Sequence, residues 1–167
     1  MYEFLQGETS TLKVGQKAPI FSLNNQNGEK ISLKTLIESG PTILYFYPKD
    51  LTPGCTREAG DFNNLLGKIR KLNSNLVGIS ADPQCSHEKF CTKLGLEFSL
   101  LSDIDHKVAE KYGVWQEKSL YGRKFMGILR STFIIGQNGK ILACWPKVKV
   151  AGHAEEVLQA LKVVAVH

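Results

Sequence analysis

The sequence predicts an α/β fold in which helices flank a mixed central sheet. Apolar runs rich in β-branched and aromatic residues, at 42–47 and 76–80, are typical of buried strands. Segments with apolar residues at helical spacing separate such runs as far as Tyr112. Beyond that point, Gly136-Gln-Asn-Gly139 carries the Asn-Gly turn signal between two further strand-like stretches. A tight hairpin forces its strands to run antiparallel, so we expect the sheet to be mixed.

The order of elements, β-α-β and then β-β-α, is that of the thioredoxin fold, here with an N-terminal β-hairpin extension. The extension is a hairpin around 24–28, followed by a short helix that Ser32 caps and Gly40 ends. The remaining predicted elements are a strand at 42–47, a helix from Pro53 to about Leu72, a strand at 76–80, a helix from Ser86 to Gly95, a strand at 98–101, a helix at 105–112, hairpin strands at 129–135 and 140–145, and a helix from Gly152.

The 167 residues fit one compact domain, 1–167, in which residues 1–10 are expected to form a loosely held tail. An apolar fraction of 43% and a charged fraction of 22% are ordinary for a soluble globular protein. The net charge of +5 is spread along the chain without a run of like charges. This pattern indicates a solvated basic surface and argues against a nucleic-acid partner.

The N-terminus as written has neither the basic region nor the long apolar stretch of a signal peptide. No apolar run approaches the roughly 20 residues of a membrane span. We therefore expect a cytoplasmic protein without a membrane partner. In that compartment cysteines are usually free, catalytic or metal-bound, and structural disulfides are rare.

The segment from Pro48 to Glu58 is expected to place a cysteine at the start of a helix. Thr52 fits the N-cap and Pro53 fits the first helical position, which puts Cys55 in the first turn. Unpaired backbone N–H groups and the positive end of the helix dipole favour a thiolate there. The alternative is a buried structural thiol, but the Pro-Gly turn and the N-cap favour a reactive cysteine.

Arg130 opens a stretch expected in the central sheet, where a guanidinium is costly without an anionic partner. The Cys55 thiolate and Glu58, one turn along the same helix, are candidate partners, and a surface arginine at a strand end is the alternative. Complete ionisation of a thiol with a pKa of ~8.5 raises its thiolate fraction at pH 7 by about 30-fold at most. Larger acceleration must come from donors such as Arg130, the Thr52 hydroxyl and backbone N–H groups. Such a site suits a small substrate with an anionic or polarised oxygen leaving group.

The other cysteines give weaker signals, because no pair forms a Cys-x-x-Cys motif. Cys85 and Cys91 flank His87, but their spacing does not match a zinc site, and we expect neither a metal nor a cofactor. Cys144 alternates with Leu142 in a strand and is expected to be a small core residue.

The histidines are expected to be solvated. His87, His106, His153 and His167 fall in polar helix or tail positions. A cysteine–histidine hydrolase would need one of them against Cys55, with a third group to orient it. The spacing gives no sign of that arrangement, although it does not exclude it.

The pattern Pro48-x-x-x-Thr52-x-x-Cys55, with Glu58 and the distant Arg130, resembles the active-site pattern of the peroxiredoxins. The longer stretch Tyr-Pro-Lys-Asp-Leu-Thr-Pro-Gly-Cys-Thr-Arg-Glu-Ala is similar to the bacterioferritin-comigratory, or Q-type, subgroup. The likeness extends over nearly the whole chain, through Gly15-Gln-Lys-Ala-Pro19, Gly78-Ile-Ser, Leu101-Ser-Asp103, Tyr112-Gly-Val-Trp115 and Gly127-Ile-Leu-Arg130.

This resemblance implies thiol-dependent reduction of hydrogen peroxide and organic hydroperoxides. Cys55 would be the peroxidatic thiolate that becomes a sulfenic acid. Thr52 and Arg130 would bind and polarise the peroxide, and Glu58 would orient Arg130. Pro48 and Pro53 would shield the pocket from water.

The chain departs from the subgroup in one place. Many Q-type members carry a second cysteine five residues after the first, where this chain has Gly60. Another branch places the resolving cysteine on the following helix, in a context like Ser86-His-Glu-Lys-Phe-Cys91-Thr-Lys. The resemblance therefore assigns the resolving role to Cys91, 36 positions after Cys55, with a thioredoxin-like dithiol as the reductant. The alternative is a one-cysteine enzyme resolved by an external thiol.

We expect Cys55 and Cys91 to begin successive helices, so that a disulfide between them requires local unwinding. Two other functions remain open. One is a peroxide sensor or holdase that passes the oxidation of the same cysteine to a partner, and the other is a thioredoxin-like metal chaperone. We expect a monomer. The sequence leaves open the preferred peroxide, the physiological reductant and any redox role of Cys85 or Cys144.

Overall fold

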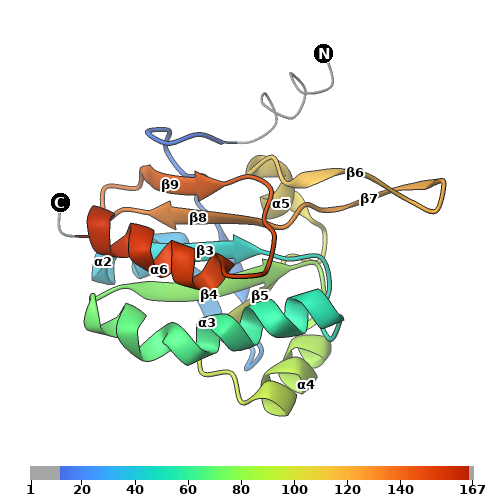
Figure 1. The fold of residues 1–167 in the computed structure, drawn as a ribbon, viewed down its shortest axis with the longest axis horizontal. Coiled ribbons are helices and arrows are strands. Elements are labelled where there is room, and N and C mark those ends of the chain that lie inside the picture. Colours follow the sequence, from blue (N-terminus) through green and yellow to red (C-terminus); the bar gives the residue numbers. More distant parts are fainter. Residues whose placement is uncertain (1–11, 166–167) are drawn as a thin grey trace.

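The computed structural model of the protein describes residues 12–165 and has a five-stranded sheet at its centre (Figure 1). In spatial order the strands are β5 (Ser99–Ser102), β4 (Asn75–Ser80), β3 (Thr42–Phe46), β8 (Ser131–Ile135) and β9 (Ile141–Trp145). β3 and β5 run parallel to β4, whereas β3–β8 and β8–β9 are antiparallel pairs. The predicted mixed sheet is therefore confirmed.

Helices cover both faces of this sheet (Figure 1). On one face, α3 (Pro53–Lys71) packs beside α6 (His153–Val164), and α4 (Gln84–Leu94) joins the same buried cluster through Phe90 and Cys91. On the other face lie α2 (Leu33–Ser39) and α5 (Lys107–Lys111). All of β3 is buried, because both of its faces are covered by helices. This strand leads directly into the loop before Cys55.

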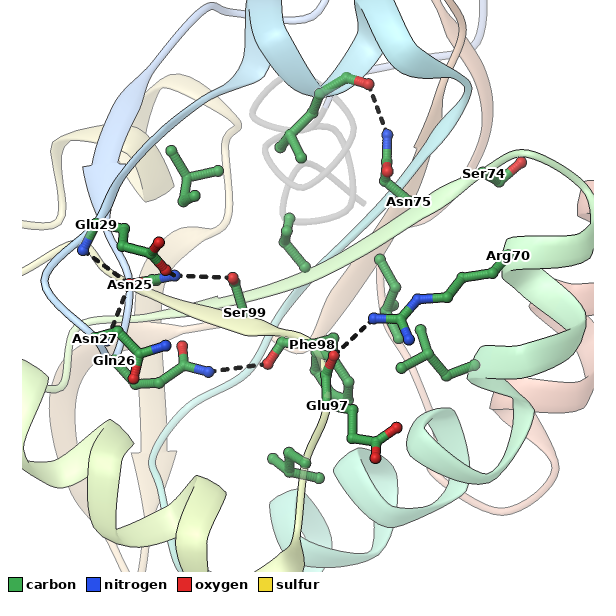
Figure 2. A pocket seen from close by; sticks show the side chains of 16 residues that line it. Asn25, Gln26, Asn27, Glu29, Arg70, Ser74, Asn75, Glu97, Phe98 and Ser99 are labelled. Atoms are coloured by element: carbon green, nitrogen blue, oxygen red, sulfur yellow. Dashed lines mark hydrogen bonds between the residues drawn. The ribbon is translucent and has the colours of Figure 1, made fainter.

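The predicted N-terminal hairpin is present as β1 (Ser22–Asn24) and β2 (Lys30–Ser32). As expected, the Ser32 hydroxyl caps α2 by accepting a backbone N–H of its first turn, at 3.2 Å. The loop of this hairpin contacts the start of the edge strand β5. The Asn25 side chain donates to Ser99 Oγ at 3.1 Å, and the Gln26 side chain donates to the Phe98 carbonyl at 3.2 Å (Figure 2). These side chains line a pocket of about 370 Å³. Their polar groups attach the hairpin to the sheet.

A second hairpin, which the sequence pattern did not predict, projects from the body of the molecule (Figure 1). Its strands are β6 (Trp115–Leu120) and β7 (Arg123–Ile128). The turn residues Tyr121 and Gly122 both have positive φ, 54° and 77°, as a type I′ turn requires. Most side chains of the hairpin are exposed, so its strands lack the apolar alternation that marks a half-buried strand.

Two predicted positions are wrong. Arg130 does not open a strand, because β8 begins at Ser131 and Arg130 lies in the connection from β7. Cys91 does not begin a helix, because α4 starts at Gln84 and Cys91 lies three residues before its end at Leu94.

The predicted tail at 1–10 and His167 lie outside the described residues. Within 12–165, no helix combines the length and the apolar character needed to cross a membrane.

Candidate active site

Cys55 lies in the first turn of α3, with Thr52 as the N-cap residue and Pro53 as the first helical residue. The cysteine is buried, with 1% of its surface exposed. The Thr52 hydroxyl does not cap the helix as expected, because it donates to the Lys49 carbonyl at 2.9 Å. Its side chain therefore closes the turn from Lys49 to Thr52 that precedes the helix, and half-buried Pro48 lies directly before that turn.

Arg130 reaches the same place from a distant part of the chain. Its Nη2 donates to Cys55 Sγ at 3.4 Å, and its Nη1 donates to Glu58 Oε1 at 2.6 Å. The Glu58 side chain is 1% exposed and the Arg130 side chain 17%. One guanidinium thus bridges a thiol and a carboxylate on the same helix, a fork-shaped contact that a lysine does not reproduce.

Backbone contacts fix the connection that carries Arg130. The Leu129 N–H donates to the Val114 carbonyl at 2.7 Å, and the Val148 N–H donates to the Arg130 carbonyl at 2.9 Å. Gly54 leaves room for the guanidinium, since a Cβ there would lie 3.2 Å from Arg130 Nη2. A glycine next to Cys55 therefore permits the close approach of Arg130.

Burial strongly affects the pKa values of the ion pair between Glu58 and Arg130. It raises the pKa of Glu58 to about 7, against the opposing effect of the Arg130 guanidinium. Burial acts to lower the pKa of Arg130, but Glu58 and Cys55 outweigh it and the net shift is upward. Among the described residues, Glu58 Oε2 has no hydrogen-bond partner although it is buried. The site thus combines a permanent cation at the sulfur with a carboxyl group that titrates near neutral pH.

A second basic residue near the site is Lys118 of β6. Its Nζ donates to the Ile128 carbonyl at 2.8 Å, two residues before Arg130. Burial lowers the pKa of Lys118, the Arg130 charge lowers it further, and Cys55 opposes them. No local pattern signals this position of Lys118, because the β6–β7 hairpin that carries it lacks the apolar alternation of a half-buried strand.

Several known proteins are similar to this chain in sequence and in fold. The AhpC/TSA family matches residues 14–144. The chain is 48% identical to the bcp protein of Coxiella burnetii over 151 residues, which are 90% of this chain and 99% of that protein. It is 45% identical to peroxiredoxin Bcp of Bacillus subtilis over 152 residues, 91% of this chain and 96% of that protein. The chain belongs to the AhpC/TSA family of peroxiredoxins.

A solved structure of peroxiredoxin Q from Xanthomonas campestris matches with a TM-score of 0.82 and 43% identity, over 87% of this chain and 91% of that one. The Q-type resemblance and the thioredoxin-like fold are therefore confirmed. Membership of this family makes the protein a thiol-dependent peroxidase, and hence an oxidoreductase.

All four cysteines of this peroxiredoxin are free in the structure. Cys91 is buried, and burial, followed by the charge of Asp50, raises its pKa to about 12. Cys85 is exposed near the start of α4. Cys144 is half-buried against the core, and burial raises its pKa. Cys91 is therefore a protonated thiol for as long as α4 stays in place.

The expectation of solvated histidines is wrong for two residues. His87 is 0% and His153 3% exposed. His153 Nε2 lies 2.8 Å from Thr132 Oγ1, and burial lowers the pKa of His153. His106 is partly exposed and stacks on the ring of Trp115. Within residues 12–165 no histidine is hydrogen-bonded to Cys55, so the geometry does not support a cysteine–histidine hydrolase.

The residues considered for a metal in the sequence do not gather into a ligand set. In the described part of the chain, the group whose ligand atoms lie within 4.8 Å of one another is Asp50, Asp82 and His87. Nδ1 of His87 is bonded to Asp50, and Nε2 to the carbonyl of Leu101. Because neither ring nitrogen is free, this cluster fits a hydrogen-bonded network better than a metal site.

Proposed function

We propose that this peroxiredoxin reduces hydrogen peroxide and organic hydroperoxides with Cys55 as the peroxidatic thiolate. The observation that carries the proposal is the Arg130 guanidinium, which lies 3.4 Å from Cys55 Sγ and is itself held by Glu58. A cation at this distance favours the thiolate and supplies a donor to a peroxide oxygen beside the sulfur. Thr52 would add a second polar contact, and Pro48 would help to exclude water.

The chemistry begins with attack of the Cys55 sulfur on one peroxide oxygen. The O–O bond breaks, the sulfur keeps one oxygen as a sulfenic acid, and the other oxygen leaves with a proton as water or an alcohol. Sulfur loses two electrons and the peroxide gains two. Arg130 stabilises the negative charge that develops on the leaving oxygen.

A relative supports organic hydroperoxides as substrates. A solved structure of the bacterioferritin comigratory protein from Xanthomonas campestris is described in terms of its alkyl peroxide reduction activity. It is 41% identical to this chain, with a TM-score of 0.82, over 87% of this chain and 92% of that one. We infer the same substrate class here.

We propose that Cys91 resolves the sulfenic acid. Its thiol attacks the Cys55 sulfur, the S–O bond breaks, and water leaves as the disulfide forms. The spacing supports this pairing: in two other structures of Xanthomonas campestris peroxiredoxin Q a cysteine is replaced by serine, and the two positions are also 36 apart. The burial of Cys91 favours the alternative of an external resolving thiol for as long as α4 stays folded.

A thioredoxin-like dithiol would return both cysteines to thiols by supplying two electrons and two protons. Such reductants are kept reduced in the cytosol, which makes the cytoplasm the compartment that fits this cycle. We retain the monomer as a prediction, to be tested by light scattering of the reduced and oxidised protein.

Peroxide consumption with a thioredoxin system tests the proposal. Cys55→Ser should consume no peroxide, because a serine hydroxyl stays protonated. Cys91→Ser should be oxidised as fast as wild type but should turn over poorly, and Cys85→Ser, on the same helix, is the matched control. Full turnover by Cys91→Ser would favour the one-cysteine enzyme. A wild-type protein that stops after one equivalent of peroxide would favour the sensor or holdase.

A further inference from the structure

A buried polar network connects the loop before Cys55 with the helix that carries Cys91. Asp50 lies in that loop, five residues before Cys55, and His87 lies on α4, four residues before Cys91. Asp50 is 4% exposed and His87 0%. Because residues four apart lie on one face of a helix, His87 and Cys91 point toward the same side of α4.

The contacts within this network are short. Asp50 Oδ2 accepts from His87 Nδ1 at 2.7 Å and from the Ser86 hydroxyl at 2.8 Å, while Oδ1 accepts from the Tyr47 hydroxyl at 2.6 Å. His87 Nε2 lies 3.0 Å from the Leu101 carbonyl oxygen. Both nitrogens of the ring therefore lie within hydrogen-bond distance of an oxygen atom. His87 and Asp50 form a buried hydrogen-bonded pair that joins α4 to the Cys55 loop.

The network also fixes the backbone of the loop. The Asp50 N–H donates at 2.8 Å to Asp82 Oδ2, which also accepts from the Ser80 hydroxyl at 2.6 Å. The next residue, Leu51, has a φ of 67°, in the left-handed region that residues other than glycine rarely adopt. Such a conformation persists only where its surroundings enforce it, and the contacts of Asp50 supply that constraint.

Cys91 is not placed to react while α4 is docked. Burial and the charge of Asp50 raise the pKa of the Cys91 thiol to about 12, so it is protonated and weakly nucleophilic. Cys55 and Cys91 both lie within continuous helices, where the Cα separation and Cβ directions that a disulfide needs are not freely adjustable. Part of α4 must therefore leave its place before Cys91 attacks Cys55.

We propose that Asp50 and His87 are positioning residues that hold α4 against the Cys55 loop, and that opening of this pair limits the attack of Cys91 on oxidised Cys55. This inference rests on the proposed function in taking Cys91 as the resolving thiol. In the docked state the pair keeps Cys91 away from the sulfur. The His87 ring joins α4 both to the loop, through Asp50, and to β5, through the Leu101 carbonyl, so loss of this side chain removes both contacts.

The Asp50–His87 pair should affect the formation of the Cys55–Cys91 disulfide and hardly affect the oxidation of Cys55 by peroxide. Peroxide meets Cys55 while α4 is docked, so loss of the pair should leave the rate of Cys55 oxidation within threefold of wild type. The conversion of sulfenic acid to disulfide should become faster by about tenfold or more, because buried Asp50 then lacks its 2.7 Å partner on α4, and a buried polar group without its partner favours the open form. Faster conversion also protects Cys55, because disulfide formation competes with further oxidation to sulfinic acid.

The experiment follows the fate of the Cys55 sulfenic acid in the full-length reduced protein. The protein is mixed with one equivalent of hydrogen peroxide and quenched at successive times with a sulfenic-acid trap and an alkylating agent. Mass spectrometry then measures the trapped Cys55 and the Cys55–Cys91 peptide. A second run at excess peroxide measures the sulfinic fraction.

Three variants separate the proposal from a general loss of stability. His87→Gln removes the imidazole ring that bonds to Asp50 and to the Leu101 carbonyl, and Ser86→Ala is a milder change that removes one hydrogen bond to Asp50. His153→Gln is the matched control, since it also alters a buried histidine, but one bonded to Thr132 of β8. Thermal unfolding shows which variants are folded. If His87→Gln does not fold, the rate of disulfide formation in Ser86→Ala tests the positioning role.

We expect faster disulfide formation and less sulfinic acid in His87→Gln, a smaller effect of the same sign in Ser86→Ala, and neither in His153→Gln. A general weakening of the fold would act in His153→Gln as well, so an effect confined to the two variants of the α4 network supports the positioning role. Unchanged or slower disulfide formation in the folded variants overturns the positioning role and leaves the proposed function intact. Absence of a Cys55–Cys91 disulfide in wild type overturns the assignment of Cys91 and this inference together.

Discussion

Replacement of Arg130 by alanine should slow the oxidation of Cys55 by at least about 100-fold. The change removes the Nη2 donor that lies 3.4 Å from Cys55 Sγ. Loss of one preorganised donor to a developing oxyanion costs about 100- to 1,000-fold in enzymes where it has been removed. The cation that favours the thiolate is lost at the same time, so we take the lower figure as a minimum.

The same variant should remain folded near neutral pH. Removal of one partner from a buried ion pair usually costs about 3–5 kcal/mol, because the other charge is left unpaired. Glu58 avoids this penalty, since burial raises its pKa to about 7 even with Arg130 present. Without the guanidinium, the carboxyl takes up a proton near neutral pH. The loss of stability should therefore be larger at pH 9 than at pH 6.

Stopped-flow mixing with excess hydrogen peroxide at pH 7 measures the oxidation rate, and thermal unfolding at pH 6 and pH 9 measures stability. Arg57→Ala is the matched control, since that side chain is 62% exposed on the same helix and makes a long ion pair with Asp61 at 4.0 Å. Arg130→Lys should recover only part of the rate, because a lysine keeps the charge but loses the fork. A rate for Arg130→Ala within threefold of wild type would refute the catalytic reading of this contact.

Three further outcomes follow from the site. Cys55→Ser should lose all peroxidase turnover while keeping the far-ultraviolet circular dichroism of the wild type, and turnover above a tenth of wild type would contradict its role. Because the folded pKa of Glu58 is raised from 4.5 to about 7, the folded state holds a proton that the unfolded state releases. Its contribution to stability is complete below pH 4.5 and is lost as the pH rises through about 7, a fall on the order of 3 kcal/mol. Glu58→Gln should abolish this fall in denaturant titrations at pH 5 and pH 8, and an unchanged difference would show that Glu58 does not titrate there. Gly54→Ala places a Cβ 3.2 Å from Arg130 Nη2 and should slow Cys55 oxidation by several-fold, because the guanidinium must shift. The melting temperature should not fall, because alanine suits a helix better than glycine. An unchanged oxidation rate would mean that Arg130 adjusts freely.

The elements that the sequence predicted correctly depend on neighbours in the chain. The Ser32 cap, the hairpin with the Asn-Gly signal and the entry of α3 at Pro53 each rest on backbone preferences within a few residues. The central strands are also predictable from short segments. A strand buried on both faces, such as β3, appears in the sequence as a continuous apolar run. Local rules alone place Cys55 at a helix start, because Thr52 fits the N-cap and Pro53 the first helical position.

Features that depend on contacts between distant segments were missed or misplaced. The hairpin of β6 and β7 is mostly exposed and has no periodic apolar pattern, so the position of Lys118 beside the site cannot be predicted from the residues around it. The Thr52 hydroxyl donates to the Lys49 carbonyl and does not accept an N–H of α3, and composition does not reveal which of these backbone partners it takes.

The fold class, the helix start at Cys55 and the family can be inferred from the residues alone, because they follow from local backbone preferences and from a long continuous likeness. Which polar groups are buried together depends on contacts between segments that lie far apart in the chain. His87 stands among charged residues in the sequence, yet it pairs with Asp50, 37 positions earlier. Arg130 reaches Cys55 across 75 positions. Such pairings depend on how β3, β4 and β8 bring their ends together in one sheet, and no preference of the neighbouring residues specifies them.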